Sequence, residues 1–87
     1  MARPLWAGEQ MKGFHVTTPK KLEKYRKTGA ILPPVRFFPN KETAERWSKR
    51  TGRPLIVEIE AHESYPLPDH KPARWTPEIV REWRLSQ

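Results

Sequence analysis

The chain has 87 residues, a formal net charge of +7 and no cysteine, which indicates one small domain. The lack of cysteine excludes disulfide frameworks, thiol nucleophiles and cysteine-based zinc sites. Apolar runs reach three residues at most, so we expect no membrane span. Residues 1–4 lead into no hydrophobic signal segment, so we expect a cytoplasmic protein. The low use of asparagine, glutamine and methionine is typical of a heat-adapted source.

The positive charge is concentrated in the first part of the chain. Residues 1–53 carry 13 lysines and arginines against four glutamates, whereas residues 54–87 carry four against six acids. A positive half-surface attracts polyanions over about 8 Å at physiological salt. Nucleic acid and phosphate-bearing ligands are therefore candidate partners, although solubility alone also accounts for a net charge of this size.

The first elements are an arm and a strand. Residues 1–12 show no periodicity and are expected to form an N-terminal arm, anchored by Leu5 and Trp6. Residues 13–17 alternate between apolar and polar side chains, which predicts a short strand with one buried face.

Two helices follow, each bounded by a capping residue and a glycine. A Thr-Pro pair predicts a helix from Pro19 to about Thr28 that ends at Gly29. Asn40 predicts the start of a second helix, from Lys41 to Thr51, which Gly52 ends.

The remaining segments are expected to be strands, a loop and a turn. Val35–Phe38 and Leu55–Glu60 are predicted strands. Residues 61–75 contain three prolines and are expected to form a long surface loop. Residues 76–78 predict the start of a short helix or turn, after which Leu85 returns to the sheet. This order predicts one α+β domain over the whole chain, with a small mixed sheet and two or three short helices.

Two features of the predicted strands suit a ligand. His15 is a polar residue on a short strand, where an imidazole serves either as a satisfied structural group or as a donor to a ligand hydroxyl or phosphate. Phe37 and Phe38 are adjacent, so one ring faces the core and the other can stack on a flat ligand. The three histidines lack metal-ligand spacing, so we expect no metal site.

A second set of candidate residues is basic and lies on the predicted helices. Such residues would bind nucleic acid mostly through its phosphates, with an affinity that falls as salt rises. The set comprises Lys20, Lys21, Lys24 and Lys27 on the first helix and Arg46, Lys49 and Arg50 on the second.

The order of these pieces resembles the ADP-ribosyltransferase-like fold, which diphtheria-toxin-type transferases, poly(ADP-ribose) polymerases and RNA 2′-phosphotransferases share. The resemblance covers residues 13–60 and rests on Phe14-His15-Val16-Thr17, the glycine-ended helix after it, the strand and turn over 35–40, and the helix start at residues 42–47. Val16 stands where the family has glycine, and a late strand with a catalytic glutamate is not recognisable. The resemblance therefore implies a truncated or degenerate member.

The resemblance also implies a ligand and roles for residues. NAD is the implied cofactor, with His15 holding a ribose hydroxyl and Thr17 orienting the strand. Phe38, or Phe37 in a shifted register, would stack on the nicotinamide or another base. Arg36 and Arg53 would meet the phosphates.

For ribosyl transfer a carboxylate would stabilise the oxocarbenium-like centre, and Glu82 and Glu78 are candidates by position. Three interpretations follow. The first is an ADP-ribosyltransferase-like domain that binds a nucleotide or a nucleic-acid phosphate group, with its catalytic activity undecided. The others are a basic nucleic-acid-binding accessory protein and a homodimeric protein-interaction module.

Overall fold

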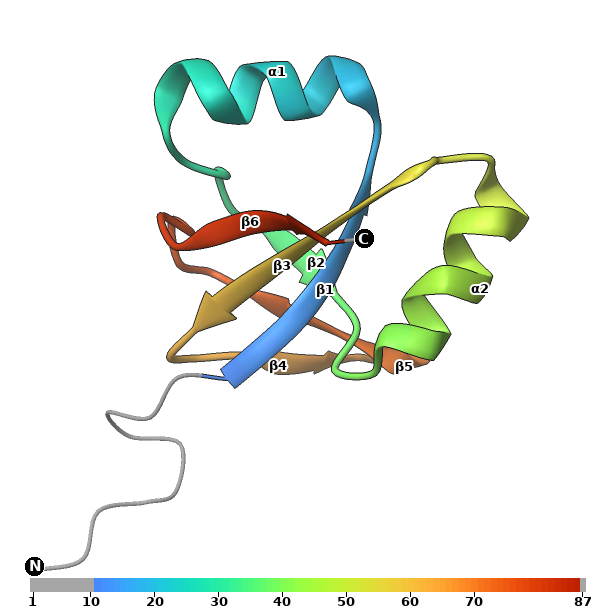
Figure 1. The fold of residues 1–87 in the computed structure, drawn as a ribbon. Coiled ribbons are helices and arrows are strands. Elements are labelled where there is room, and N and C mark those ends of the chain that lie inside the picture. Colours follow the sequence, from blue (N-terminus) through green and yellow to red (C-terminus); the bar gives the residue numbers. More distant parts are fainter. Residues whose placement is uncertain (1–10, 87) are drawn as a thin grey trace, which may run out of the picture.

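The computed structural model describes residues 11–86 and has two helices and two three-stranded sheets (Figure 1). The first sheet has the order β1–β3–β6, with β1 (Met11–Thr17), β3 (Leu55–Ala61) and β6 (Trp83–Ser86). The second has the order β2–β5–β4, with β2 (Val35–Phe37), β5 (His70–Thr76) and β4 (Tyr65–Leu67). The α+β class is confirmed. The prediction of a single mixed sheet is wrong, because the structure has two sheets and every strand pair is antiparallel.

The helices α1 (Pro19–Thr28) and α2 (Lys41–Thr51) have the predicted bounds. Oγ1 of Thr18 accepts a hydrogen bond from the third residue of α1, and Oδ1 of Asn40 accepts one from the second residue of α2. The glycine after each helix has a φ of 73°, the left-handed conformation that ends many helices. Within the described part of the chain, no helix is long and apolar enough to cross a bilayer.

The prediction of a long surface loop over residues 61–75 is wrong, because most of this segment forms the hairpin of β4 and β5. Its prolines lie where a sheet tolerates them. Pro66 is on an edge strand beside a register shift, and Pro72 lies beyond β2, whose pairing with β5 ends at Arg74. A pattern of prolines that predicts a loop is therefore also compatible with an edge strand and a partly paired central strand.

The ends of the chain also differ from expectation. The predicted arm ends earlier, because Met11 and Lys12 belong to β1; Leu5 and Trp6 lie outside the described residues. No helix begins at residues 76–78, and Val80 forms an antiparallel bridge with Ile31 instead. The predicted return of residue 85 to the sheet is confirmed by β6.

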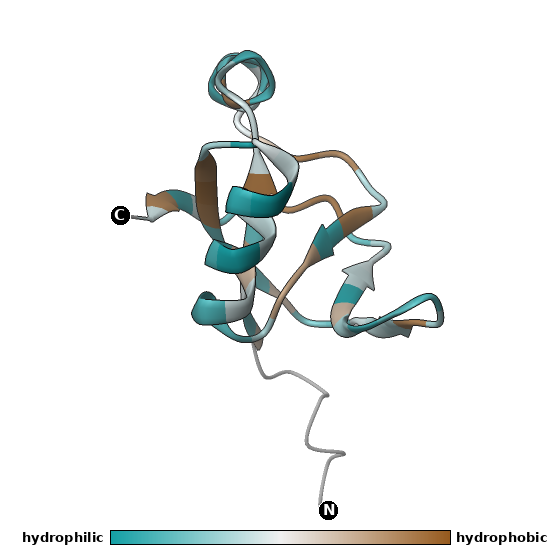
Figure 2. Ribbon diagram, turned by 90° about the vertical axis from the view of Figure 1, so that its right-hand side faces the viewer, coloured by the Kyte–Doolittle hydropathy of each residue, from teal (hydrophilic) through white to brown (hydrophobic). Residues whose placement is uncertain are grey.

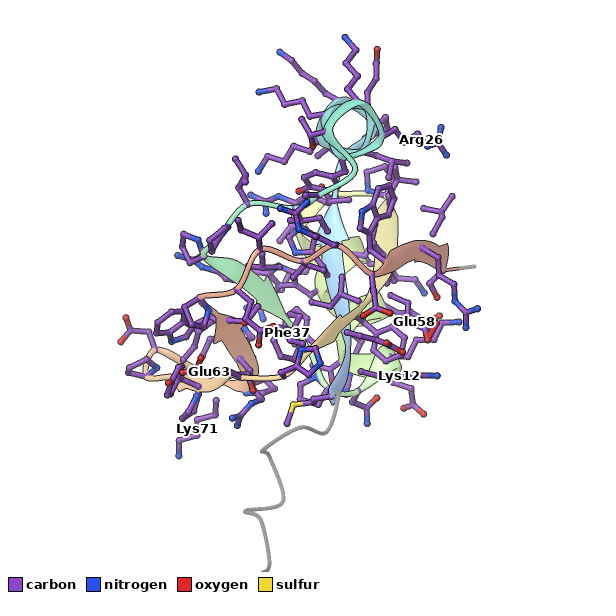
Figure 3. The ribbon with its side chains drawn as sticks, turned by 90° about the vertical axis from the view of Figure 1, so that its left-hand side faces the viewer. Lys12, Arg26, Phe37, Glu58, Glu63 and Lys71 are labelled. Carbon is purple, nitrogen blue, oxygen red and sulfur yellow. The ribbon has the colours of Figure 1, made fainter. Side chains whose placement is uncertain are left out.

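Two apolar clusters hold the domain together, and Figure 2 shows largely teal helices with the brown segments mainly in the strands and connections. One cluster joins both sheets to α1 and contains Leu22, Ile31, Val35, Phe37, Val57, Ile59 and Val80. Figure 3 shows Phe37 in the interior and Arg26 on the outside of α1. The second cluster lies under α2 and contains Val16, Phe38, Ala44 and Ala73.

The two sheets meet at one backbone bridge. Phe14 and Phe38 exchange N–H to O hydrogen bonds of 2.8 and 2.9 Å. One residue further along β1, the side chain of His15 reaches the carbonyl of Arg36 on β2. This junction positions the candidate site.

Candidate functional site

A cavity of about 570 Å³, which we call the central cavity, lies at the junction of the two sheets. Its volume is within the range of about 300–1,000 Å³ that is usual for small-molecule sites. Residues of β1, α1, β2, α2 and the β4–β5 hairpin line it, among them four of the predicted ligand-binding residues, His15, Arg36, Phe38 and Arg53. The fold therefore brings together residues that are 38 positions apart in the chain.

One wall of the central cavity is aromatic. The ring centroids of Phe38 and Trp47 are 6.0 Å apart, and His70 lies 5.6 Å from Phe38 and 4.7 Å from Trp47, edge-on to both. Phe37, the alternative in a shifted register, is buried in the first cluster instead and does not line the cavity. Phe38 lines the cavity but is 5% exposed and belongs to the second cluster, so the half-buried Trp47 and His70 offer more of the aromatic surface to a ligand.

The polar lining of the central cavity is mainly cationic. Lys21, Arg36 and Arg53 line it, and all three are exposed residues. Asp69 is the acidic residue in the lining. Three cations against one carboxylate favour an anionic ligand.

His15 is held by the protein at both ring nitrogens. Nδ1 lies 2.7 Å from the carbonyl oxygen of Arg36, which can only accept, so Nδ1 carries the proton and donates. In the neutral ring Nε2 then accepts from the hydroxyl of Tyr25, at 3.0 Å. Thr17 is buried, does not line the cavity, and has its hydroxyl 3.4 Å from that of Tyr25. A ribose hydroxyl at Nε2 would therefore have to replace Tyr25.

This environment makes the stability of the domain depend on pH. Burial lowers the pKa of His15 below 6.5, the hydrogen bond to Arg36 opposes this, and the charges of Lys21 and Arg53 lower the pKa further. A lowered folded pKa means that the unfolded chain binds the proton more readily. The contribution of His15 is therefore fully present above pH 6.5 and is lost as the pH falls through the folded pKa.

We expect the free energy of unfolding in urea to decrease between about pH 7 and about pH 5, and to decrease less in His15→Asn. Asparagine has no titration in this range, so the difference between the two proteins isolates His15 from the other titrating groups. Equal pH dependence in the two proteins would contradict this prediction.

The two candidate carboxylates do not lie in the central cavity. The carboxylate of Glu78 accepts from the backbone N–H of His62 at 2.7 Å and from that of Glu63. His62 follows β3 at the end that pairs with Met11, whereas His15 pairs with Val57. The fold thus places Glu78 near the opposite end of β1 from His15.

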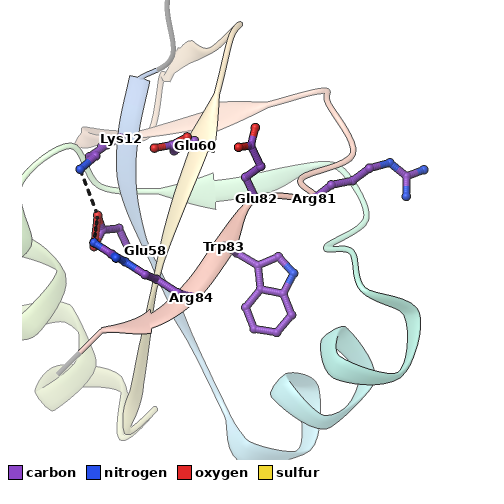
Figure 4. A pocket seen from close by; sticks show the side chains of 7 residues that line it. All are labelled: Lys12, Glu58, Glu60, Arg81, Glu82, Trp83 and Arg84. Carbon is purple, nitrogen blue, oxygen red and sulfur yellow. Dashed lines mark hydrogen bonds and ion pairs between the residues drawn. The ribbon is translucent and has the colours of Figure 1, made fainter.

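Glu82 lines a different cavity, of about 390 Å³, over the first sheet (Figure 4). Beside it, Glu58 lies between Lys12 and Arg84, with N–O distances of 3.6 and 3.3 Å. The acids of this cavity are thus accompanied by cations, and Glu82 is separated from the cations of the central cavity.

The predicted nucleic-acid-binding residues are all exposed and fall into two groups. Lys21, Lys24 and Lys27 line a cavity of about 450 Å³ beside α1, which we call the α1 cavity. Arg46 and Arg50 line one of about 350 Å³ beside α2, the α2 cavity. Lys20 and Lys49 line none of the four cavities described here.

Sequence reasoning missed two residues of the aromatic wall. His70 lies within residues 61–75, for which the sequence predicts a loop, and Trp47 lies on the second predicted helix, where only basic residues are candidates. Nδ1 of His70 is buried and has no hydrogen-bond partner among the described residues. The buried residues of β5, Ala73 and Thr76, do not alternate, and the strand contains Pro72, so no periodic signal in the sequence pointed to His70.

Residues 11–86 contain no group of three His, Asp or Glu side chains that could hold a metal ion. The site therefore consists of an apolar aromatic wall, an internally bonded histidine and a cationic rim. Comparison of the chain with protein-family models, with curated proteins and with solved structures finds no match.

Proposed function

We propose that this chain is an ADP-ribosyltransferase-like domain that binds a nucleotide in the central cavity. The observation that carries the proposal is the combination, in one cavity of about 570 Å³, of an aromatic wall with three cations. A base offers a flat apolar face and a phosphate offers negative charge, so a nucleotide matches both features. Stacking of a base on an aromatic side chain contributes about 1–3 kcal/mol, and a hydrogen bond to a charged group about 1.5–3 kcal/mol.

Within this proposal, NAD is the ligand that the family resemblance favours. The aromatic wall that contains Phe38 would contact a base, and Arg36 and Arg53 would contact the phosphates. The proposal is limited to binding, because Glu78 and Glu82 lie outside the central cavity. Ribosyl transfer needs a group placed to stabilise positive charge on the ribose.

The test is the affinity of a double variant, Arg36→Gln with Arg53→Gln, for ADP, NAD and adenosine by isothermal titration calorimetry. Loss of two charged contacts should weaken binding of ADP and NAD at least tenfold, which is about 1.4 kcal/mol. Adenosine has no phosphate, so its affinity should change by less than about threefold if the two arginines act on phosphates.

A matched control is the double variant Arg26→Gln with Lys71→Gln, which loses the same charge. Both residues are exposed, lie far apart in Figure 3 and line none of the four cavities. An equal loss of affinity for ADP in both double variants would show that the effect comes from net charge alone. It would overturn the assignment of the central cavity as the nucleotide site. If none of the three ligands binds at low salt, the nucleotide proposal falls and the homodimeric interaction module, tested by sedimentation, takes its place.

A further inference from the structure

The central cavity adjoins a cavity on each side and shares lining residues with both. It shares His15, Lys21 and Pro34 with the α1 cavity. It shares the aromatic wall, formed by Phe38, Trp47 and His70, with the α2 cavity. The three cavities therefore lie in a row, with the α1 cavity at one end and the α2 cavity at the other. Figure 1 shows the two helices on adjacent sides of the domain.

Besides Lys21, which lines both the α1 cavity and the central cavity, each of the three cavities has a pair of cations of its own. They are Lys24 and Lys27 in the α1 cavity, Arg36 and Arg53 in the central cavity, and Arg46 and Arg50 in the α2 cavity. Asp69 is the acidic side chain in the lining of the three. Positive charge is thus distributed along the whole run of cavities, which matches a ligand with repeated negative charges better than one with a single phosphate group.

Rings separate these cation pairs. The imidazole of His15 lies at the first boundary, with Tyr25 in contact with it at a centroid distance of 5.9 Å. The aromatic wall forms the second boundary. Proteins that bind single strands combine a basic groove along the backbone with rings on which bases stack. A duplex hides the faces of its bases, so it could use the cations but not the rings.

We infer that the central cavity takes one nucleotide of a single-stranded nucleic acid, whose neighbouring nucleotides occupy the α1 and α2 cavities. This inference rests on the proposed function, because it requires a nucleotide in the central cavity. It goes further in naming a polynucleotide as the ligand, and it unites the two sets of residues that sequence reasoning assigned to different functions.

The first test compares thymidine monophosphate with oligothymidylates of three and six nucleotides, by titration at one salt concentration. Affinity should rise at least tenfold from the monomer to the trimer, because the trimer reaches the cations of the flanking cavities. The dependence of log K on log salt should also become steeper, by roughly 0.7 for each additional phosphate contact in a single strand. A hairpin duplex of adenine–thymine pairs should bind more weakly than the hexamer.

The second test removes the flanking cations alone. The double variants Lys24→Gln with Lys27→Gln and Arg46→Gln with Arg50→Gln should each bind the hexamer at least tenfold more weakly. Each should lower the salt slope by about 1.4, which corresponds to two phosphate contacts. Binding of ADP should stay within twofold of the original protein, and Arg26→Gln with Lys71→Gln is again the charge-matched control.

The outcomes separate this inference from the proposed function. ADP binding without a gain for the trimer, or flanking variants that bind the hexamer normally, would overturn the inference and leave the nucleotide site standing. A hexamer that needs the flanking cations but not Arg36 and Arg53 would also overturn it, since the strand would then bypass the central cavity. Tighter binding of the duplex, or equal competition by polyglutamate, would indicate general attraction of polyanions and overturn it as well.

Discussion

Replacement of Gly13 by alanine is expected to destabilise the domain by about 3 kcal/mol or more, the upper end of what overpacking costs. A Cβ at this position would lie 2.1 Å from Cδ2 of Phe37 and within 2.8 Å of two further ring atoms. Phe37 is 1% exposed and belongs to the first cluster, so its ring has little space to move. Urea unfolding followed by circular dichroism measures the change.

Two further variants give this prediction its control. Gly29→Ala adds a methyl group where no atom lies within 4 Å but where φ is +73°, so it should cost only about 1–2 kcal/mol of backbone strain. Phe37→Leu should relieve part of the clash, so the cost of Gly13→Ala should be smaller in that background. A Gly13→Ala protein whose free energy of unfolding is within 1 kcal/mol of the original would show that the sheets pack differently at this point.

Replacement of His15 by alanine is expected to cost about 2–3 kcal/mol, because it removes two hydrogen bonds and leaves both partners to find others. Nδ1 and Nε2 join β1 to β2 and to α1 through Arg36 and Tyr25. His15→Asn keeps a donor near the carbonyl of Arg36 and should recover about half of this loss. Tyr25→Phe removes the bond to Nε2 and the 3.4 Å contact with the hydroxyl of Thr17, and should cost about 1 kcal/mol.

The same variants test the ribose role implied by the family resemblance. In Tyr25→Phe, Nε2 of His15 loses its protein partner and is free to accept from a ligand hydroxyl. If His15 holds a ribose hydroxyl, this variant should bind ADP more tightly than the original protein. Unchanged affinity in Tyr25→Phe, together with destabilisation in His15→Ala, would make His15 a structural link between the strands and α1.

The helices could be predicted to the residue because their ends depend on near neighbours. Each begins after a side chain that accepts a backbone hydrogen bond within three residues, and each ends at a glycine in the left-handed conformation. The alternation of β3 was equally local: Val57 and Ile59 are fully buried while Glu58 and Glu60 are not.

The hairpin of β4 and β5 could not be predicted in this way. Its strands contain Pro66 and Pro72, and proline is unfavourable inside a sheet unless its N–H would have no partner. For Pro72 on β5, whether such a partner exists depends on the register against β2, which lies about 40 residues earlier in the chain. The pairing of β2 with β5 is seen only in the structure.

The candidate site likewise has features that depend on neighbouring residues and features that depend on distant ones. The sequence by itself determined the types of group available, since His15, Phe38, Arg36 and Arg53 each follow from a strand or helix end that neighbouring residues predict. The tertiary structure alone decided that Trp47 and His70 join them, that Glu78 and Glu82 do not, and that both nitrogens of His15 are bonded internally. The reason is physical: caps and periodicity depend on interactions within a few residues, whereas a cavity depends on which distant surfaces pack against one another.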